Sequence, residues 1–250
     1  MEPALYIDAL EREGTRLADT ADAIDPNAAV PTCPGWTLRD LLQHLGGVHH
    51  WAGEHIRGRL PQVLRVDDFR DLVGEWPDDT ALVDWYRGEL DLLLDTFRAA
   101  PRDIDCARFL KSPDPLSFWT RRQAHEATIH RADVEAIIDR LTPVDTPFAL
   151  DGIDELVDGF VPRPFMKLRS EQPLTLGIAP SDSDLVWLLT ISEGPVTIST
   201  ERAESDCTVG GSASDVYFAL WNRADDARLD ISGRRDVFDL FRTKIAIKWS

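Results

Sequence analysis

Residues 31–52 read PTCPGWTLRDLLQHLGGVHHWA and hold a well-marked helix start. Thr37 follows a loop with two prolines, and Asp40 stands three residues further on. A hydroxyl residue followed at this spacing by an acidic one is a variant of the capping box, in which each side chain bonds the other residue's backbone N–H. We therefore predict a helix that starts after Thr37 and runs to about Arg57.

Three more helices are predicted around this one. Apolar residues recur at helical spacing from Pro3 to Ile24 and from Asp79 to Ala99. A further helix starts near Ser117, after two prolines, and continues to about Arg140. Four long helices with antiparallel neighbours predict a four-helix bundle over residues 1–142, and the interior of such a bundle is a common place for metal ligands.

The pattern changes after the bundle. Leu141 to Leu150 contains two prolines and is predicted to be a linker in which helix does not easily continue. Beyond it, short apolar and β-branched runs separated by Pro, Gly, Ser and Asp indicate strands at Leu174–Ile178, Leu185–Ile191, Val196–Ser199, Cys207–Val209 and Leu229–Ile231. Amphipathic spacing indicates helices at Ser212–Arg223 and Arg234–Ile245. We predict a small α+β domain over residues 148–250, and hence a two-domain α+β protein.

Composition narrows the class of protein. The chain has 250 residues and a net charge of −17, which repels nucleic acids and anionic membranes, so small molecules are the expected partners. No run approaches the roughly 18 apolar residues of a membrane span, and the first residues lack an export signal, so a cytoplasmic location is expected. Three widely spaced cysteines are expected to be reduced thiols. We expect a monomer or a small homo-oligomer.

All six histidines fall in two short segments, from Gln43 to His55 and from His125 to His130. Within the first segment, His44 and His55 share a helix face, whereas His49 is rotated from His44 by roughly 140°. His44 and His55 are about 16 Å apart along the axis, so one metal ion cannot bind both.

The second segment has a metal-ligand spacing. Glu126 and His130 are four residues apart and therefore lie side by side on one helix face. The run from His125 to His130 is one residue too long for the HExxH arrangement of zinc proteases. Together with His44, the pair supplies two imidazoles and a carboxylate, which leaves coordination positions open as catalytic metal sites do. Zinc suits this set first, although iron, manganese and nickel tolerate it.

Plainer interpretations stay open at this point. A Glu and a His at this spacing are often only a pair on a helix surface. The other four histidines are expected to be partly exposed or to support the ligands, and Cys33 is not favoured as a nucleophile, because loop cysteines are commonly inert. Gly46 and Gly47 weaken the helix that carries them, which suggests a close crossing or room beside the metal.

The quoted run from Pro31 to Ala52, followed by RRQAHEATIHRADVEA from Arg121 to Ala136, resembles the mycothiol-dependent maleylpyruvate isomerase family of actinobacteria. The resemblance implies a DinB-like metal-binding bundle followed by a sterol-carrier-protein-like α+β domain over about Phe148 to Trp249. It implies that His44, Glu126 and His130 hold a zinc ion.

The chemistry that this resemblance implies is metal-assisted thiol activation, in which the thiol of mycothiol attacks a small electrophile. In the isomerase the thiolate adds to a conjugated double bond, rotation follows, and elimination returns the product. The segment LWNR resembles the family's Trp-Gly-Arg pattern, with Asn222 in place of glycine, and implies that Arg223 acts in catalysis by holding a substrate carboxylate. Ala132 stands where members of the family often have Trp, which affects the expected shape of the substrate pocket.

These observations favour a zinc-dependent, mycothiol-using S-transferase or maleylpyruvate-isomerase-like enzyme. The alternative is a non-catalytic, metal-containing module that binds small molecules or has a regulatory role, because a protein can retain a fold and a metal site after it has lost the activity. Metal-dependent hydrolysis with Glu126 as the base is the weakest of the three hypotheses, since Glu126 is better placed as a ligand.

Overall fold

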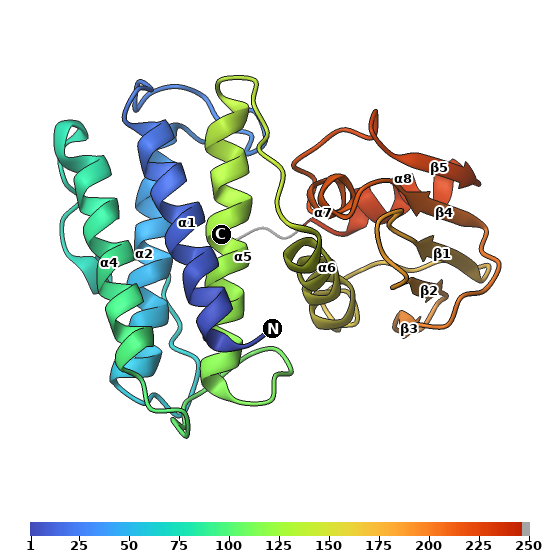
Figure 1. The fold of residues 1–250 in the computed structure, drawn as a ribbon, viewed down its shortest axis with the longest axis horizontal. Coiled ribbons are helices and arrows are strands. Elements are labelled where there is room, and N and C mark those ends of the chain that lie inside the picture. Colours follow the sequence, from blue (N-terminus) through green and yellow to red (C-terminus); the bar gives the residue numbers. More distant parts are fainter. Residues whose placement is uncertain (247–250) are drawn as a thin grey trace. The chain divides into compact units, whose positions relative to one another are not determined.

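The computed structural model describes residues 1–246 and divides into two compact units, Met1–Thr142 and Pro143–Ser250. The first unit is helical, and the second is built on a β-sheet with helices (Figure 1). The predicted two-domain α+β class is confirmed. Trp249, which falls in the predicted second domain, lies outside the described residues.

Four long helices form the first unit, as predicted. They are α1 (Pro3–Ala21), α2 (Leu38–Arg57), α4 (Leu82–Ala99) and α5 (Pro115–Ala136), and they lie side by side in Figure 1. Helix α1 packs on α5 and α4, and α2 packs on α4 and α5. Helices α1 and α5 end earlier than the sequence pattern suggested. Asp139, with a φ of 53°, turns the chain away shortly after α5.

Side-chain caps start the two helices that carry the histidines. The Thr37 side chain accepts a hydrogen bond from the backbone N–H of Asp40, and the Asp40 carboxylate accepts one from the backbone N–H of Thr37, so the predicted capping box is present. Asp114 caps α5 more simply, because its side chain accepts a hydrogen bond from the backbone N–H of Ser117. Pro115 occupies the first turn, where the missing N–H has no partner to lose.

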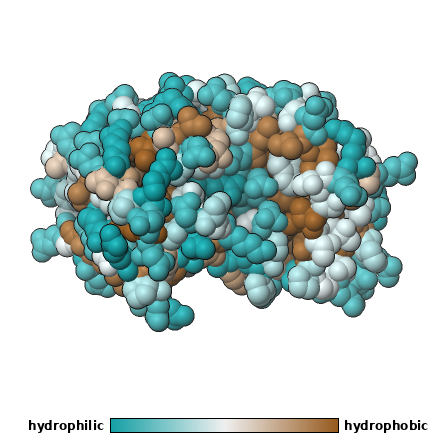
Figure 2. Space-filling view, turned by 60° about the horizontal axis from the view of Figure 1, so that its bottom comes forward, coloured by the Kyte–Doolittle hydropathy of each residue, from teal (hydrophilic) through white to brown (hydrophobic). Residues whose placement is uncertain are grey.

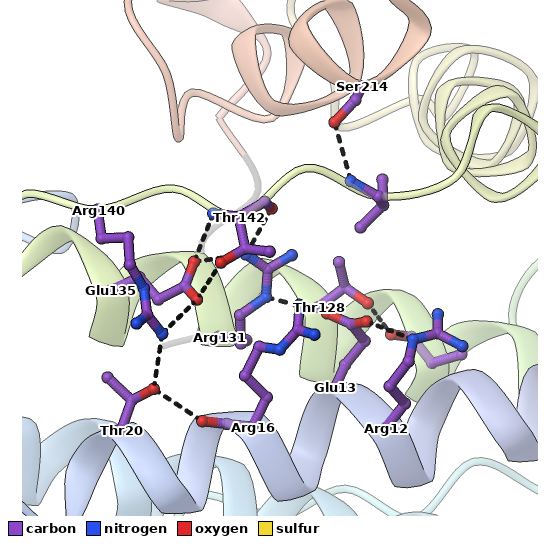
Figure 3. A network of polar contacts seen from close by, with 12 residues as sticks. Arg12, Glu13, Arg16, Thr20, Thr128, Arg131, Glu135, Arg140, Thr142 and Ser214 are labelled. Carbon is purple, nitrogen blue, oxygen red and sulfur yellow. Dashed lines mark hydrogen bonds and ion pairs between the residues drawn. The ribbon is translucent and has the colours of Figure 1, made fainter.

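Helix α5 is buried along nearly its whole length and is held to α1 by a buried ion network (Figure 3). The Arg131 side chain is fully buried; its Nε donates to Glu13 Oε2 at 2.9 Å, and its Nη1 donates to Glu135 Oε2 at 2.6 Å. The same Nη1 donates to the backbone oxygen of Thr142, whose N–H donates to Glu135. This network fixes the rotation of α5, and hence which of its side chains face α2.

A long connection between α2 and α4 was not resolved into elements by the sequence pattern. It contains the short helix α3 (Arg70–Val73) and the 3-10 turn η1 (Asp79–Ala81). His55 anchors its beginning, because its Nε2 accepts from the N–H of Leu64 at 3.0 Å, and Trp51 Nε1 donates to the oxygen of Leu64 at 2.9 Å.

The second unit has a five-stranded sheet of order β3-β2-β1-β4-β5. Strands β1 and β4 pair in parallel, and the other neighbours are antiparallel. Alternate residues of β1 are buried against helix α8. The elements are α6 (Thr146–Asp154), the π-helical turn η2 (Glu155–Phe160), β1 (Leu174–Ile178), β2 (Trp187–Ile191), β3 (Thr197–Ser199), β4 (Cys207–Gly210), α7 (Ala213–Leu220), β5 (Asp230–Gly233) and α8 (Arg235–Lys244).

The linker prediction for Leu141 to Leu150 was wrong in its second half. Helix α6 begins at Thr146, and Pro147 lies in its first turn. A proline is tolerated there because the first N–H groups of a helix have no intrahelical partner. Phe148 and Ile153 give α6 a buried face, which packs against α7.

Among the described residues, no helix is long and apolar enough to cross a membrane. The face shown in Figure 2 is mainly hydrophilic, with hydrophobic residues in scattered groups.

Candidate metal centre

Three potential ligands from two helices lie together inside the bundle. His44 comes from α2, and Glu126 and His130 come from α5. One ligand atom from each lies within 4.8 Å of the other two. Glu126 Oε1 is 3.7 Å from His44 Nε2 and 3.2 Å from His130 Nε2, and the two imidazole centroids are 5.2 Å apart. The structure thus brings together the three predicted ligands.

The three side chains are largely removed from water. Their exposed fractions are 10% for His44, 4% for Glu126 and 6% for His130. Burial lowers the pKa of His44, which favours its neutral form, the form that binds metal. Its Nε2 is buried without a hydrogen-bond partner. A buried lone pair beside a carboxylate oxygen and a second imidazole nitrogen is an arrangement that a divalent cation satisfies.

His130 is oriented by a carboxylate on its far side. Asp133, fully buried, places Oδ2 2.8 Å from His130 Nδ1, and Thr32 donates a hydrogen bond to the other oxygen of Asp133. Burial alone would lower the pKa of His130, but the hydrogen bonds to Asp133 and Glu126 outweigh it and raise the pKa. When Nδ1 carries the proton that bonds Asp133, Nε2 is left as the lone pair that faces Glu126.

Glu126 is oriented by an arginine one turn earlier on α5. Arg122 Nη2 lies 2.9 Å from Glu126 Oε2, and the Arg122 side chain is 2% exposed. Burial opposes ionisation of Glu126, but the positive charge of Arg122 and the two histidines hold its pKa well below the usual range. Because Arg122 engages Oε2, Oε1 is the oxygen that faces the histidines.

Neither of these supporting residues was predicted from the sequence. Asp133 follows His130 by three residues, and Arg122 precedes Glu126 by four, so both share a helix face with the ligand that they hold. That spacing was the available signal. The spacing is not specific, because charged pairs three or four residues apart are common on helix surfaces.

Of the two alternatives for the remaining histidines, partial exposure was wrong for His49, His55 and His125, which are fully buried. His49 Nδ1 lies 2.7 Å from Gln123 Oε1, and burial lowers its pKa to about 4. Helices α2 and α5 each pack on two or more neighbours, so residues rotated away from the ligand face still meet protein. His50 is half-buried beside Glu89, as expected.

The comparisons with known proteins agree with the resemblance seen in the sequence. The model of the mycothiol maleylpyruvate isomerase N-terminal domain matches residues 7–135, and that of the family's C-terminal domain matches residues 147–240. The chain belongs to the mycothiol-dependent maleylpyruvate isomerase family. Members of this family are isomerases, and the predicted membership is confirmed.

Solved structures of the family share the fold. The crystal structure of the mycothiol-dependent maleylpyruvate isomerase matches with a TM-score of 0.63 and 12% identity, over 93% of each chain. A histidine-to-alanine mutant of that enzyme matches with a TM-score of 0.62 and 13% identity, also over 93% of each chain. No curated protein sequence matches this chain. At these identities the likeness shows the shared fold alone.

The departure from the family's Trp-Gly-Arg pattern has a structural explanation. Asn222 has a φ of 60°, in the left-handed region that favours glycine and that asparagine tolerates better than most residues. Its amide donates to the oxygen of Ile245 at 2.9 Å and accepts from Arg242 Nε at 3.1 Å. Arg223, the predicted catalytic arginine, follows directly, and its Nη1 donates to the oxygen of Trp221 at 2.9 Å. Asn222 therefore makes a left-handed turn directly before Arg223.

Proposed function

We propose that this member of the family is a zinc-dependent enzyme that uses mycothiol as its thiol co-substrate. In this proposal it acts as an S-transferase or a maleylpyruvate-isomerase-like enzyme on a small electrophile. The observation that carries the proposal is the buried convergence of His44, Glu126 and His130, each of which offers a ligand atom within 4.8 Å of the others. The family's mycothiol dependence supports the choice of thiol.

The residues present fit a divalent zinc ion. His44 Nε2 is an orphaned buried acceptor, Glu126 is held ionised, and His130 Nε2 is left as an acceptor when Asp133 bonds Nδ1. Two imidazoles and one carboxylate are a common zinc ligand set and leave a position open. When bound, zinc supplies a Lewis acid that lowers the pKa of a thiol and so yields the stronger nucleophile at neutral pH.

The protein's own part is to orient the ligands and to keep water out. Asp133 fixes the ring of His130, and Arg122 fixes the carboxylate of Glu126. Because Arg122 neutralises Glu126 and occupies one of its oxygens, Glu126 is poorly suited to act as a free general base. This arrangement favours thiol activation over metal-dependent hydrolysis.

In the proposed reaction, Arg223 holds a carboxylate of the electrophile, for which a guanidinium fork is well shaped. Arg223→Ala is expected to raise KM for carboxylate-bearing electrophiles while leaving zinc content unchanged. Arg228→Ala is the matched control, since this arginine lies in the same unit and its side chain is 74% exposed. Equal KM values for the wild type and Arg223→Ala would show that Arg223 does not hold the substrate carboxylate.

The proposed function is tested by following both thiol loss, which reports S-transfer, and isomerisation of the electrophile at catalytic thiol, against pH for zinc-loaded and chelated protein. Zinc-loaded protein is expected to show one of these two activities well below the free thiol's pKa of about 8.5, because a divalent cation favours the thiolate. Chelated protein at the same pH should be inactive. Identical pH profiles with and without metal would leave the non-catalytic binding module as the better interpretation.

A further inference from the structure

The two histidines of the candidate centre are held in different ways. His130 is oriented by a hydrogen bond from its Nδ1 side to Asp133. The ring of His44 instead meets two aromatic rings edge to face: the centroid of Trp36 is 5.0 Å away at 63°, and that of Phe69 is 5.9 Å away at 68°. Orientation of His44 therefore depends on packing.

Phe69 reaches His44 through a notch in α2. If residue 47 had a Cβ atom, it would lie 2.5 Å from Cγ and 2.7 Å from Cβ of Phe69, which is closer than real Cβ contacts. Gly47 is thus the residue that lets the ring sit against the helix, three positions after His44. Glycine weakens a helix, and at this position the contact with Phe69 accounts for its presence.

The two rings contact the most exposed of the three ligands. His44 is more exposed than Glu126 or His130, and both Trp36 and Phe69 are half-buried. Trp36 comes from the loop before α2, and Phe69 directly precedes α3, which has no buried residue of its own. Phe69 is therefore the side chain through which this part of the connection reaches the centre.

We propose that Phe69, seated on Gly47, is a positioning residue that works with Trp36 as an aromatic clamp on His44. The proposal rests on the proposed metal site and extends it. An imidazole without a hydrogen-bonded partner turns about its χ2 angle, for which the energy profile is broad. Edge-to-face contacts on two sides restrict this rotation and keep Nε2 directed at Glu126. The clamp replaces for His44 the orienting role that Asp133 has for His130.

Two variants test the clamp in different ways. Phe69→Ala removes the ring, and Gly47→Ala leaves the ring but forces it away from α2. Both are expected to weaken zinc binding by about 10- to 100-fold, the usual effect of losing a group that orients a ligand. The visible spectrum of the cobalt-substituted protein should shift in both, because it reports the ligand geometry. Gly88→Ala, another helical glycine with open space around it, should change neither measurement.

The Gly47→Ala variant separates positioning from a merely structural role. Alanine is the better helix former, so helix propensity alone would leave zinc binding unchanged or improved. A metal-independent readout is the NMR signal of the His44 ring in zinc-free protein, expected to be sharp in the wild type and broadened by exchange in both variants. Unchanged zinc affinity and unchanged His44 signals in either variant would overturn the clamp. A wild type that binds no zinc would refute the proposed function, while the NMR comparison would still decide the clamp.

Discussion

Replacement of Asp133 tests how much the orientation of His130 contributes to metal binding. Asp133→Asn keeps an oxygen that can accept from His130 Nδ1 but removes the charge, and Asp133→Ala removes both. The side chain is fully buried, with one oxygen 2.8 Å from His130 and the other bonded by Thr32, so water does not take its place easily. Loss of such a partner lowers metal affinity by about 10- to 100-fold, or about 1.4 to 2.7 kcal/mol.

We expect the asparagine variant near the lower end of this range and the alanine variant near the upper end. The assay is competition for zinc against a chromogenic chelator, with circular dichroism to check the fold. Asp139→Asn is the matched control, because Asp139 lies just beyond α5, is exposed, and has a left-handed φ that asparagine tolerates. An Asp133→Ala protein that is folded and binds zinc as tightly as the control would refute the assigned role.

Three further predictions follow from buried side chains of the bundle. His125→Ala should retain zinc but lose stability in urea, because His125 is fully buried against Tyr6 and does not face the centre. Arg131→Met should lower the free energy of unfolding by about 3 kcal/mol, measured by urea unfolding, since it removes the buried cation between two glutamates. The loss stays near the lower end for a broken buried pair because Glu13 keeps Arg12 and Glu135 keeps Thr142. His49 has a pKa lowered from 6.5 to about 4, so the unfolded state binds its proton first and stability is lost as pH falls below 6.5. Between pH 7 and 5, the titration of His49 lowers the free energy of unfolding of the wild type by about 2 kcal/mol. The His49→Gln protein should therefore lose about 2 kcal/mol less than the wild type over the same pH range.

Much of the bundle could be predicted because its signals are local. The capping box at Thr37 and the helical periodicity fix both the start and the rotation of α2, and the four-residue spacing of Glu126 and His130 fixes a shared face on α5. The second rule paired Glu126 with His130, whereas the first placed both His44 and His55 on one face, and the family resemblance pointed to His44. Packing between helices is not local, and so the burial of His49 was missed.

The errors have identifiable physical causes. Pro147 was interpreted as a helix breaker, although a proline in a first turn is compatible with the helix that the structure contains. Asp133 and Arg122 were not predicted because they are not metal ligands and act only by orienting His130 and Glu126. The contact between Phe69 and Gly47 joins a connecting segment to a helix, and neither residue alone signals it in the sequence.

The central claim is that His44, Glu126 and His130 hold one metal ion, and metal analysis of the purified protein tests it most directly. Elemental analysis by inductively coupled plasma mass spectrometry is expected to find one zinc ion per chain in the wild type. His130→Ala, checked for folding, should contain essentially none, whereas His50→Ala, which changes a half-buried histidine on the same bundle, should keep a full equivalent. A wild type without stoichiometric metal, or a folded His130→Ala protein with as much zinc as the wild type, would contradict the account.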